Sequence, residues 1–171
     1  MDEPFDAVLF DRDGTLIRDV PYNGDPDLVT VMPGAREVLR DLRERGLRTG
    51  VVSNQSGIGR GLLTTEQVAA VNARVEELLG EFGTWQICPH HPGEGCACRK
   101  PAPGLVLAAC EVLDVRPERV VVVGDIGADV DAAEAAGAVS VLVPTPVTRQ
   151  DEVDRAPRTA PDLRSAIGMI L

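Results

Sequence analysis

The sequence predicts an α/β protein built on a doubly wound, mostly parallel β-sheet. Short runs rich in Val and Leu alternate along the chain with segments of helical character, a pattern typical of right-handed βαβ crossovers. Aromatic residues make up only 3% of the chain, so aliphatic side chains must form the core. Acidic and hydroxyl residues follow several of the apolar runs, at the strand ends where open α/β sheets bind ligands.

Five segments are expected to form the strands. They are short, and two of them are continuously apolar, as expected of strands that are covered on both faces. The predicted strands are residues 7–10, 48–53, 85–88, 120–123 and 139–143.

Three amphipathic patterns and one Ala-rich segment predict helices between the strands, and a last helix is expected near the C-terminus. Thr64 and Gln67 form a capping box at one helix start, whereas Gly46 and Gly137 are helix-ending glycines. Cys110 lies on an apolar helix side and is expected to be buried. The predicted helical segments are residues 35–42, 68–79, 105–112, 129–136 and 162–171.

Charge and length narrow the class of protein. A formal net charge of -10 and a pI of about 4.6 disfavour nucleic acid and anionic membranes as partners. No apolar run approaches the roughly 18 residues of a membrane span, and the acidic N-terminus does not resemble a signal peptide. We therefore expect one domain over residues 1–171 in the cytoplasm, where the four cysteines are thiols or metal ligands.

Three motifs at strand ends carry chemistry: Asp11 with Asp13, Ser53, and Asp125 with Asp129 four residues later. Mg²⁺ prefers oxygen ligands and is held by carboxylates and substrate phosphate. With charge neutralised by the metal, Asp11 can attack phosphorus, and Asp13 can act as acid and then base. Turn chemistry explains Asp125 alone equally well, but the three motifs together favour catalysis.

The only lysine of the chain is Lys100; the other basic residues are arginines. A compact ammonium differs from the planar arginine fork, so we expect a functional role for Lys100 and not a chance surface position. Four arginines in the candidate loops would supply the positive potential that a phosphate site needs. Of these, Arg12, Arg18 and Arg60 are each expected to be solvated surface residues, and Arg99 to contact the substrate.

Asp-Arg-Asp-Gly-Thr at residues 11–15, a strand-ending Ser53, the later Lys100 and Gly-Asp-x-x-x-Asp at 124–129 resemble the four motifs of the haloacid dehalogenase superfamily. The resemblance implies the Rossmann-like fold of that superfamily. It implies that Asp11 is the nucleophile and Asp13 the acid–base residue, and that Ser53 and Lys100 contact the phosphoryl group. It also implies a Mg²⁺ site formed by Asp11, Asp125 and the backbone carbonyl of Asp13.

Both histidines and three of the four cysteines lie within residues 88–98. Zn²⁺ favours a tetrahedron of sulfur and nitrogen ligands, and a closed set of four is structural. Packing or a disulfide is the alternative, but Cys96 and Cys98 are too close for an unstrained bridge and the loop has little apolar surface. The residues leave the histidine open; the Cys-Pro-His order of the resemblance favours His90 over His91. The predicted zinc ligands are Cys88, His90, Cys96 and Cys98.

Within the superfamily, the zinc loop is similar to two branches that lack a large cap, the D-glycero-D-manno-heptose-1,7-bisphosphate 7-phosphatases and the histidinol-phosphate phosphatases. Residues 53–61 and 98–104 resemble the heptose branch, and residues 19–22 stand where that branch contacts its substrate. One departure is Ile126, where the heptose branch usually has Lys and the histidinol branch Arg. The substrate contacts that the resemblance implies are Asp19, Tyr22, Asn54, Gln55, Ser56, Arg60 and Arg99.

We therefore expect a monomeric, Mg²⁺-dependent phosphomonoesterase with a structural Zn²⁺ and a minimal cap. The expected reaction removes the C7 phosphate of D-glycero-D-manno-heptose 1,7-bisphosphate; histidinol phosphate or another small sugar phosphate is the alternative substrate. No nucleic acid or membrane partner is expected. A receiver-type signalling domain also combines a strand-end Asp, a Ser or Thr and a Lys, but Asp13 would hydrolyse the aspartyl-phosphate that a receiver must keep.

Overall fold

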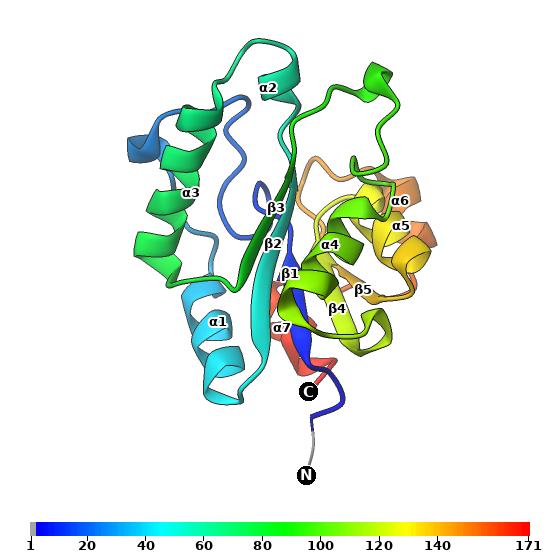
Figure 1. Cartoon of the computed structure of the whole chain (residues 1–171). Coiled ribbons are helices and arrows are strands. Elements are labelled where there is room, and N and C mark those ends of the chain that lie inside the picture. Colours follow the sequence, from blue (N-terminus) through cyan, green and yellow to red (C-terminus); the bar gives the residue numbers. More distant parts are fainter. Residues whose placement is uncertain (1–2) are drawn as a thin grey trace.

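A computed structural model describes residues 3–171, which form a five-stranded sheet with helices on both faces (Figure 1). The strand order is β3-β2-β1-β4-β5, and each of these neighbours pairs in parallel. The doubly wound parallel sheet predicted from the sequence is confirmed. The strands are β1 (Ala7–Phe10), β2 (Arg48–Asn54), β3 (Thr84–Cys88), β4 (Val120–Gly124) and β5 (Val139–Leu142).

Helices cover the sheet in two groups, as Figure 1 shows. The first group, on one face, is α1 (Ala35–Glu44), α3 (Thr65–Leu79) and α7 (Leu163–Gly168). The second group, on the opposite face, is α4 (Gly104–Leu113) and α5 (Gly127–Ala136). Two shorter helices lie in connections, α2 (Ser56–Gly59) and α6 (Gln150–Arg155), and three 3-10 turns are η1 (Pro26–Leu28), η2 (Pro92–Glu94) and η3 (Pro117–Arg119).

The central strand β1 divides the core into two layers. All four of its residues are buried, and successive side chains of a strand point to opposite faces. Val8 and Phe10 pack in the cluster under α1, α3 and α7, whereas Ala7 and Leu9 pack in the cluster under α4 and α5. Both clusters consist of aliphatic side chains with few aromatic ones, as the composition predicts.

The predicted helix ends are confirmed at several positions. The side chain of Thr64 accepts a hydrogen bond from the Gln67 N–H at 3.1 Å, and the Gln67 side chain accepts one from the Thr64 N–H at 2.9 Å. Gly46 and Gly137 have φ values of 78° and 85° just beyond α1 and α5, a left-handed conformation that glycine adopts without a steric cost. Cys110 is buried on α4, also as predicted.

The structure differs from the sequence prediction in the short elements. Helices α2 and α6 are absent from the prediction because four and six residues are too few to show a helical period. Helix α7 covers Leu163–Gly168 and not all of residues 162–171. Within residues 3–171, no helix is both long and apolar enough to cross a membrane.

Candidate active site and zinc loop

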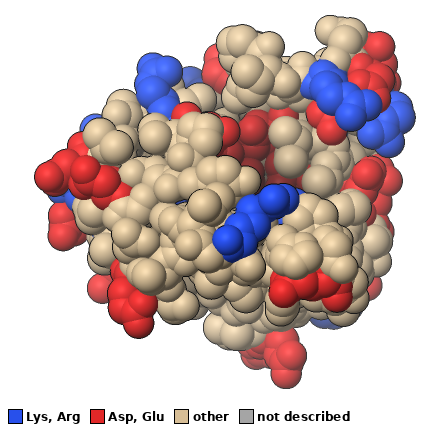
Figure 2. Space-filling view, turned by 90° about the horizontal axis from the view of Figure 1, so that it is seen from above, with Lys and Arg blue, Asp and Glu red and all other residues tan. Residues whose placement is uncertain are grey.

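The carboxyl edge of the sheet brings three acidic side chains together. Asp11 follows β1, Asp125 follows β4, and Asp129 lies in the first turn of α5. Their carboxylate oxygens lie within 4.8 Å of one another, and all three residues are buried. Seen from above, this edge is hollowed, with acidic side chains at its floor (Figure 2).

Burial and mutual repulsion disfavour the charged forms of these acids. Burial, with repulsion from Asp11 and Asp129, raises the pKa of Asp125 to about 9. Burial, with repulsion from Asp129, raises the pKa of Asp11 to about 6. A cation beside these acids would favour their charged forms, and their oxygen donors fit a hard divalent cation such as Mg²⁺.

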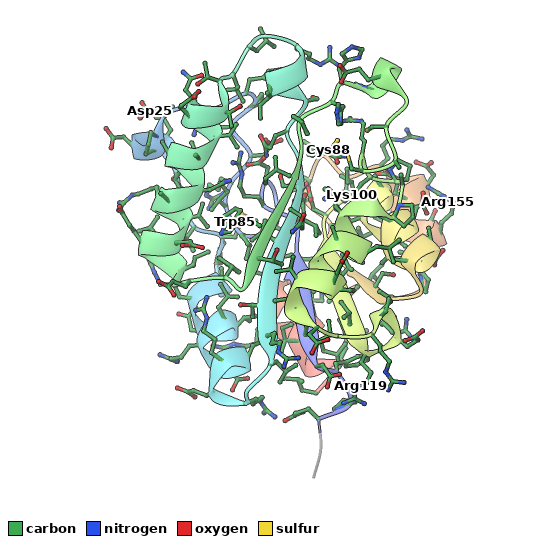
Figure 3. All side chains as sticks on the ribbon, in the orientation of Figure 1. Asp25, Trp85, Cys88, Lys100, Arg119 and Arg155 are labelled. Carbon is green, nitrogen blue, oxygen red and sulfur yellow. The ribbon has the colours of Figure 1, made fainter. Side chains whose placement is uncertain are left out.

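Lys100 supplies one positive charge to the cluster (Figure 3). Its ammonium donates to Asp129 Oδ1 at 2.6 Å, to the Val52 carbonyl at 2.8 Å and to Asp11 Oδ1 at 3.1 Å. An ammonium has three donors, so each has an acceptor. Burial alone lowers the pKa of Lys100, but Asp11 and Asp129 raise it by more, so the pKa lies above its usual value and the group stays charged.

Asp129 also holds the end of β4. Its Oδ2 accepts hydrogen bonds from the N–H groups of Asp125 at 3.0 Å and Ile126 at 3.2 Å. A Cβ on Gly124 would collide with the Asp129 carboxylate, which explains the glycine before Asp125. The sequence places Asp129 in the Gly-Asp-x-x-x-Asp motif, but it does not indicate that this residue pairs with Lys100 and accepts these main-chain bonds.

A glycine shapes the loop after β1 as well. Gly14 has a φ of 84°, and a Cβ there would collide with the Asp125 carboxylate. The loop that this turn allows places the Thr15 hydroxyl 3.2 Å from Asp125 Oδ1. Thr15 ends the Asp-Arg-Asp-Gly-Thr motif, and its hydroxyl donates to an acid predicted to hold the metal.

Asp13 is held by Arg12 and Gln55. Nε and Nη2 of Arg12 donate to its two carboxylate oxygens at 3.2 and 3.1 Å, and Gln55 Nε2 donates to Oδ2 at 2.9 Å. Arg12 also donates to Asn72 of α3 at 2.9 Å and is only 2% exposed. The expectation of a solvated surface arginine is therefore wrong for Arg12, because a carboxylate and an amide satisfy its guanidinium in the interior.

Ser53 is buried at the end of β2, and its hydroxyl accepts from the same Gln55 amide at 2.8 Å. Beside it opens a cavity of about 230 Å³. Arg60 is exposed, and Arg99 donates a long bond of 3.5 Å to the His90 carbonyl; neither belongs to the cavity lining that the structure describes. The sequence-predicted residues that line the cavity are Asp13, Asp19, Tyr22, Asn54, Gln55 and Ser56.

The loop of residues 88–98, called the zinc loop below for its predicted ligands, brings these four side chains together. Cys98 Sγ lies 3.1 Å from Cys88 Sγ and 3.3 Å from His90 Nδ1, and Cys88 Sγ lies 3.6 Å from Cys96 Sγ. His91 lies outside this group of four, and its Nδ1 accepts from the Gly93 N–H at 3.1 Å.

Three thiols and one imidazole are a donor set that suits Zn²⁺. The thiols differ in acidity. Burial raises the pKa of Cys88 to about 12, whereas for Cys96 the raising effect of desolvation is outweighed by hydrogen bonds, chiefly from the Arg99 N–H, which lower the pKa to about 6. All four cysteines of the chain are free of disulfides, so the cluster is available to a metal ion.

Known proteins are similar to this chain in sequence. Residues 20–137 match the haloacid dehalogenase-like hydrolases. The chain is 38% identical over 147 residues to a D-glycero-beta-D-manno-heptose-1,7-bisphosphate 7-phosphatase of Pseudomonas putida, covering 81% of this chain and 82% of the relative. It is 36% identical over 166 residues to the enzyme of that name from Yersinia pestis, covering 89% and 88% of the two chains.

A solved structure extends the likeness to three dimensions. The D,D-heptose 1,7-bisphosphate phosphatase of B. bronchiseptica, crystallised with magnesium and phosphate, superposes with a TM-score of 0.84. The match covers 95% of this chain and 97% of that one, at 28% sequence identity.

Proposed function

The chain belongs to the haloacid dehalogenase-like hydrolase family, and from that premise we propose a Mg²⁺-dependent phosphatase that removes the C7 phosphate of D-glycero-D-manno-heptose 1,7-bisphosphate. The observation that carries the proposal is the buried ammonium of Lys100 between Asp11 and Asp129, beside Asp125. The relatives named above supply the substrate class.

Asp11, Asp125 and the backbone carbonyl of Asp13 would hold Mg²⁺. When bound, the ion neutralises the carboxylates and the substrate phosphate, so that two negative groups can approach each other. The raised pKa values of Asp11 and Asp125 support this assignment, because a cation is what would let both acids lose their protons near neutral pH.

In the first step, a carboxylate oxygen of Asp11 attacks phosphorus, and the bond from phosphorus to the leaving oxygen breaks. Asp13 gives its proton to that oxygen, which leaves as the sugar hydroxyl. The Ser53 hydroxyl and the Lys100 ammonium stabilise the charge on the transferring phosphoryl group. The product of this step is an aspartyl-phosphate on Asp11.

In the second step, water attacks the phosphorus of the aspartyl-phosphate and Asp13 accepts its proton. Phosphate leaves, and Asp11 returns as a carboxylate. Arg12 and Gln55 fix the Asp13 carboxylate through the hydrogen bonds described above. A positioned acid–base group of this kind contributes about 10²–10⁴-fold to the rate.

The cavity beside Asp13 would take the sugar. Its polar lining by Asp19, Tyr22 and Ser56 suits hydroxyl groups, and the basic Arg60 and Arg99 would meet the second phosphate outside it. Ile126 is 38% exposed and adds no charge. Compared with a chain that has Lys or Arg at this position, the lost charge-assisted contact would weaken binding of a second phosphate by about 1.5–3 kcal/mol.

The loop of residues 88–98 is proposed to bind one structural Zn²⁺ through Cys88, His90, Cys96 and Cys98, because the ligand atoms of these residues lie within 4.8 Å of one another and Zn²⁺ favours four such ligands. Free thiols and such a cluster suit a reducing compartment, which supports a cytoplasmic location. We propose that residues 1–171 form one domain and act as a monomer. A stable dimer in a solution mass measurement would contradict the monomer.

The test of function is phosphate release, with and without Mg²⁺, from both anomers of heptose 1,7-bisphosphate, histidinol phosphate and common hexose phosphates. Asp11→Asn is the blank. The proposal requires Mg²⁺-dependent release with a clear preference for a heptose bisphosphate. Preference for histidinol phosphate or a hexose phosphate would keep the mechanism and overturn the substrate, whereas undiminished release by Asp11→Asn would overturn the mechanism.

A further inference from the structure

We propose that Asn54 is a positioning residue that fixes the main chain of Lys100, and not a side chain that binds substrate. The inference rests on the proposed function, in which the Lys100 ammonium holds the transferring phosphoryl group. It replaces the substrate contact that the sequence resemblance implies for Asn54.

The carboxamide of Asn54 bridges both main-chain polar groups of Lys100. Nδ2 of Asn54 donates to the Lys100 carbonyl at 3.1 Å, and the Lys100 N–H donates to Asn54 Oδ1 at 3.0 Å. This reciprocal pair of bonds resembles the exchange between two opposite residues of neighbouring strands, and it joins the end of β2 to Lys100. Both of its bonds join parts of the chain 46 residues apart.

Strand β2 therefore holds Lys100 at both ends of its side chain. Two residues before Asn54, the carbonyl of Val52 accepts from the Lys100 ammonium at 2.8 Å. With the main chain fixed at one end and the ammonium at the other, the side chain spans a set distance to Asp11 and Asp129.

The Asn54–Lys100 hydrogen bonds also fix the end of the zinc loop beside the candidate active site. At the start of the loop, the carbonyls of Cys88 and Pro89 accept from the N–H groups of Gln55 and Gly59, each at 2.8 Å. The loop ends at Cys98, two residues before Lys100. Asn54 thus holds the chain just after the end of the loop, where Lys100 enters the candidate active site.

The lone lysine makes the inference directly measurable. Protein labelled with ¹⁵N-lysine carries one lysine backbone amide and one side-chain ammonium, both from Lys100. In the wild type, we expect slow hydrogen exchange at both groups. In Asn54→Ala, we expect exchange at the ammonium to be roughly tenfold faster or more, because loss of the two bonds frees the main chain.

Asn23→Ala is the matched control. Asn23 makes the same reciprocal pair with Asp25, at 3.0 and 2.8 Å, and its loss should leave the Lys100 signals unchanged. Rapid exchange of the Lys100 amide in the wild type would overturn the proposal that Asn54 fixes the main chain of Lys100, and this test needs no variant. Equal ammonium exchange in folded Asn54→Ala and wild type would also overturn it. Neither result depends on activity, so failure of the positioning role of Asn54 is distinguishable from failure of the proposed function.

Steady-state kinetics separate positioning from substrate binding. A displacement of about 1 Å in a reacting group can cost about 10²-fold, so Asn54→Ala should lower kcat by roughly that factor and leave KM within about twofold. In a Lys100→Arg background, Asn54→Ala should have little further effect, because it acts through Lys100. A raised KM at unchanged kcat, or losses that multiply in the double variant, would instead identify Asn54 as a substrate contact.

Discussion

Lys100 and Asp129 form an ion pair of 2.6 Å in which the side chains are 2% and 1% exposed. A pair this well buried depends on both partners, because a single charge left behind in the interior is costly, whereas a surface pair contributes little. Asp129 also accepts two main-chain hydrogen bonds at the end of β4. The pair thus joins the segment that follows the Cys/His cluster, through Lys100, to the end of β4, where Asp125 lies.

Asp129→Ala should lower the free energy of unfolding by about 3–5 kcal/mol, since it leaves a buried ammonium short of one carboxylate. Urea unfolding monitored by circular dichroism measures this change. Asp131→Ala, the same substitution two residues later on α5, should change stability by no more than about 0.5 kcal/mol. Equal midpoints for the two variants would contradict the role of the ion pair.

The stability of the protein without Mg²⁺ should fall as pH rises. Asp11 and Asp125 have an ordinary pKa of 3.8 and folded pKa values of about 6 and 9, so the folded state binds more protons than the unfolded state. Their stabilising contribution is full below pH 3.8 and is lost as pH rises through these folded values. Melting temperatures measured without Mg²⁺ through these two folded values test the sign; lower pH is avoided because it would protonate the Cys and His ligands proposed for zinc.

Two comparisons isolate the cause of that pH dependence. Asp125→Asn cannot titrate at this position, so its melting temperature should fall less steeply with pH than that of the wild type. Saturating Mg²⁺ should stabilise the wild type most at high pH, because only the deprotonated acids bind metal. Parallel curves for the wild type and Asp125→Asn would show that Asp125 is not the group responsible.

Protein purified without chelators should contain about one equivalent of zinc, as expected of a four-ligand structural site. Cys96→Ser should lose it, because Cys96 belongs to the group of four ligands. Cys110→Ser should keep it, because Cys110 is buried on α4 outside that group. Elemental analysis decides the point, and full zinc content in Cys96→Ser would contradict the ligand assignment.

The sequence was sufficient to predict the sheet because its signals are local. Apolar runs mark the strands, and the parallel arrangement then brings Asp11 and Asp125 to one edge. The Cys/His cluster is also predictable, since all four of its residues lie within eleven consecutive residues, 88–98. A preference for His90 over His91 agrees with the geometry of the cluster.

What the sequence does not indicate depends on contacts between distant segments. Arg12 is buried because Asn72, 60 residues away, accepts from its guanidinium. Asn54 and Asp129 meet Lys100 across 46 and 29 residues, and no periodicity records such a pairing. The single lysine suggests that an acidic partner exists, but the sequence does not indicate which acid is the partner.

An aspartyl-phosphate on Asp11 would be seen by intact-mass analysis of an acid-quenched Asp13→Asn variant. Asp13 acts in both steps, so the substrate is p-nitrophenyl phosphate, whose leaving group needs no proton; the first step is then kept, whereas hydrolysis of the aspartyl-phosphate should slow by about 10²–10⁴-fold. With Mg²⁺ and this substrate, we expect one phosphoryl group to accumulate on the protein, and digestion should place it on the peptide containing Asp11. Turnover by wild type with no phosphoryl-protein in this variant, and phosphate release retained in Asp11→Asn, would contradict this mechanism.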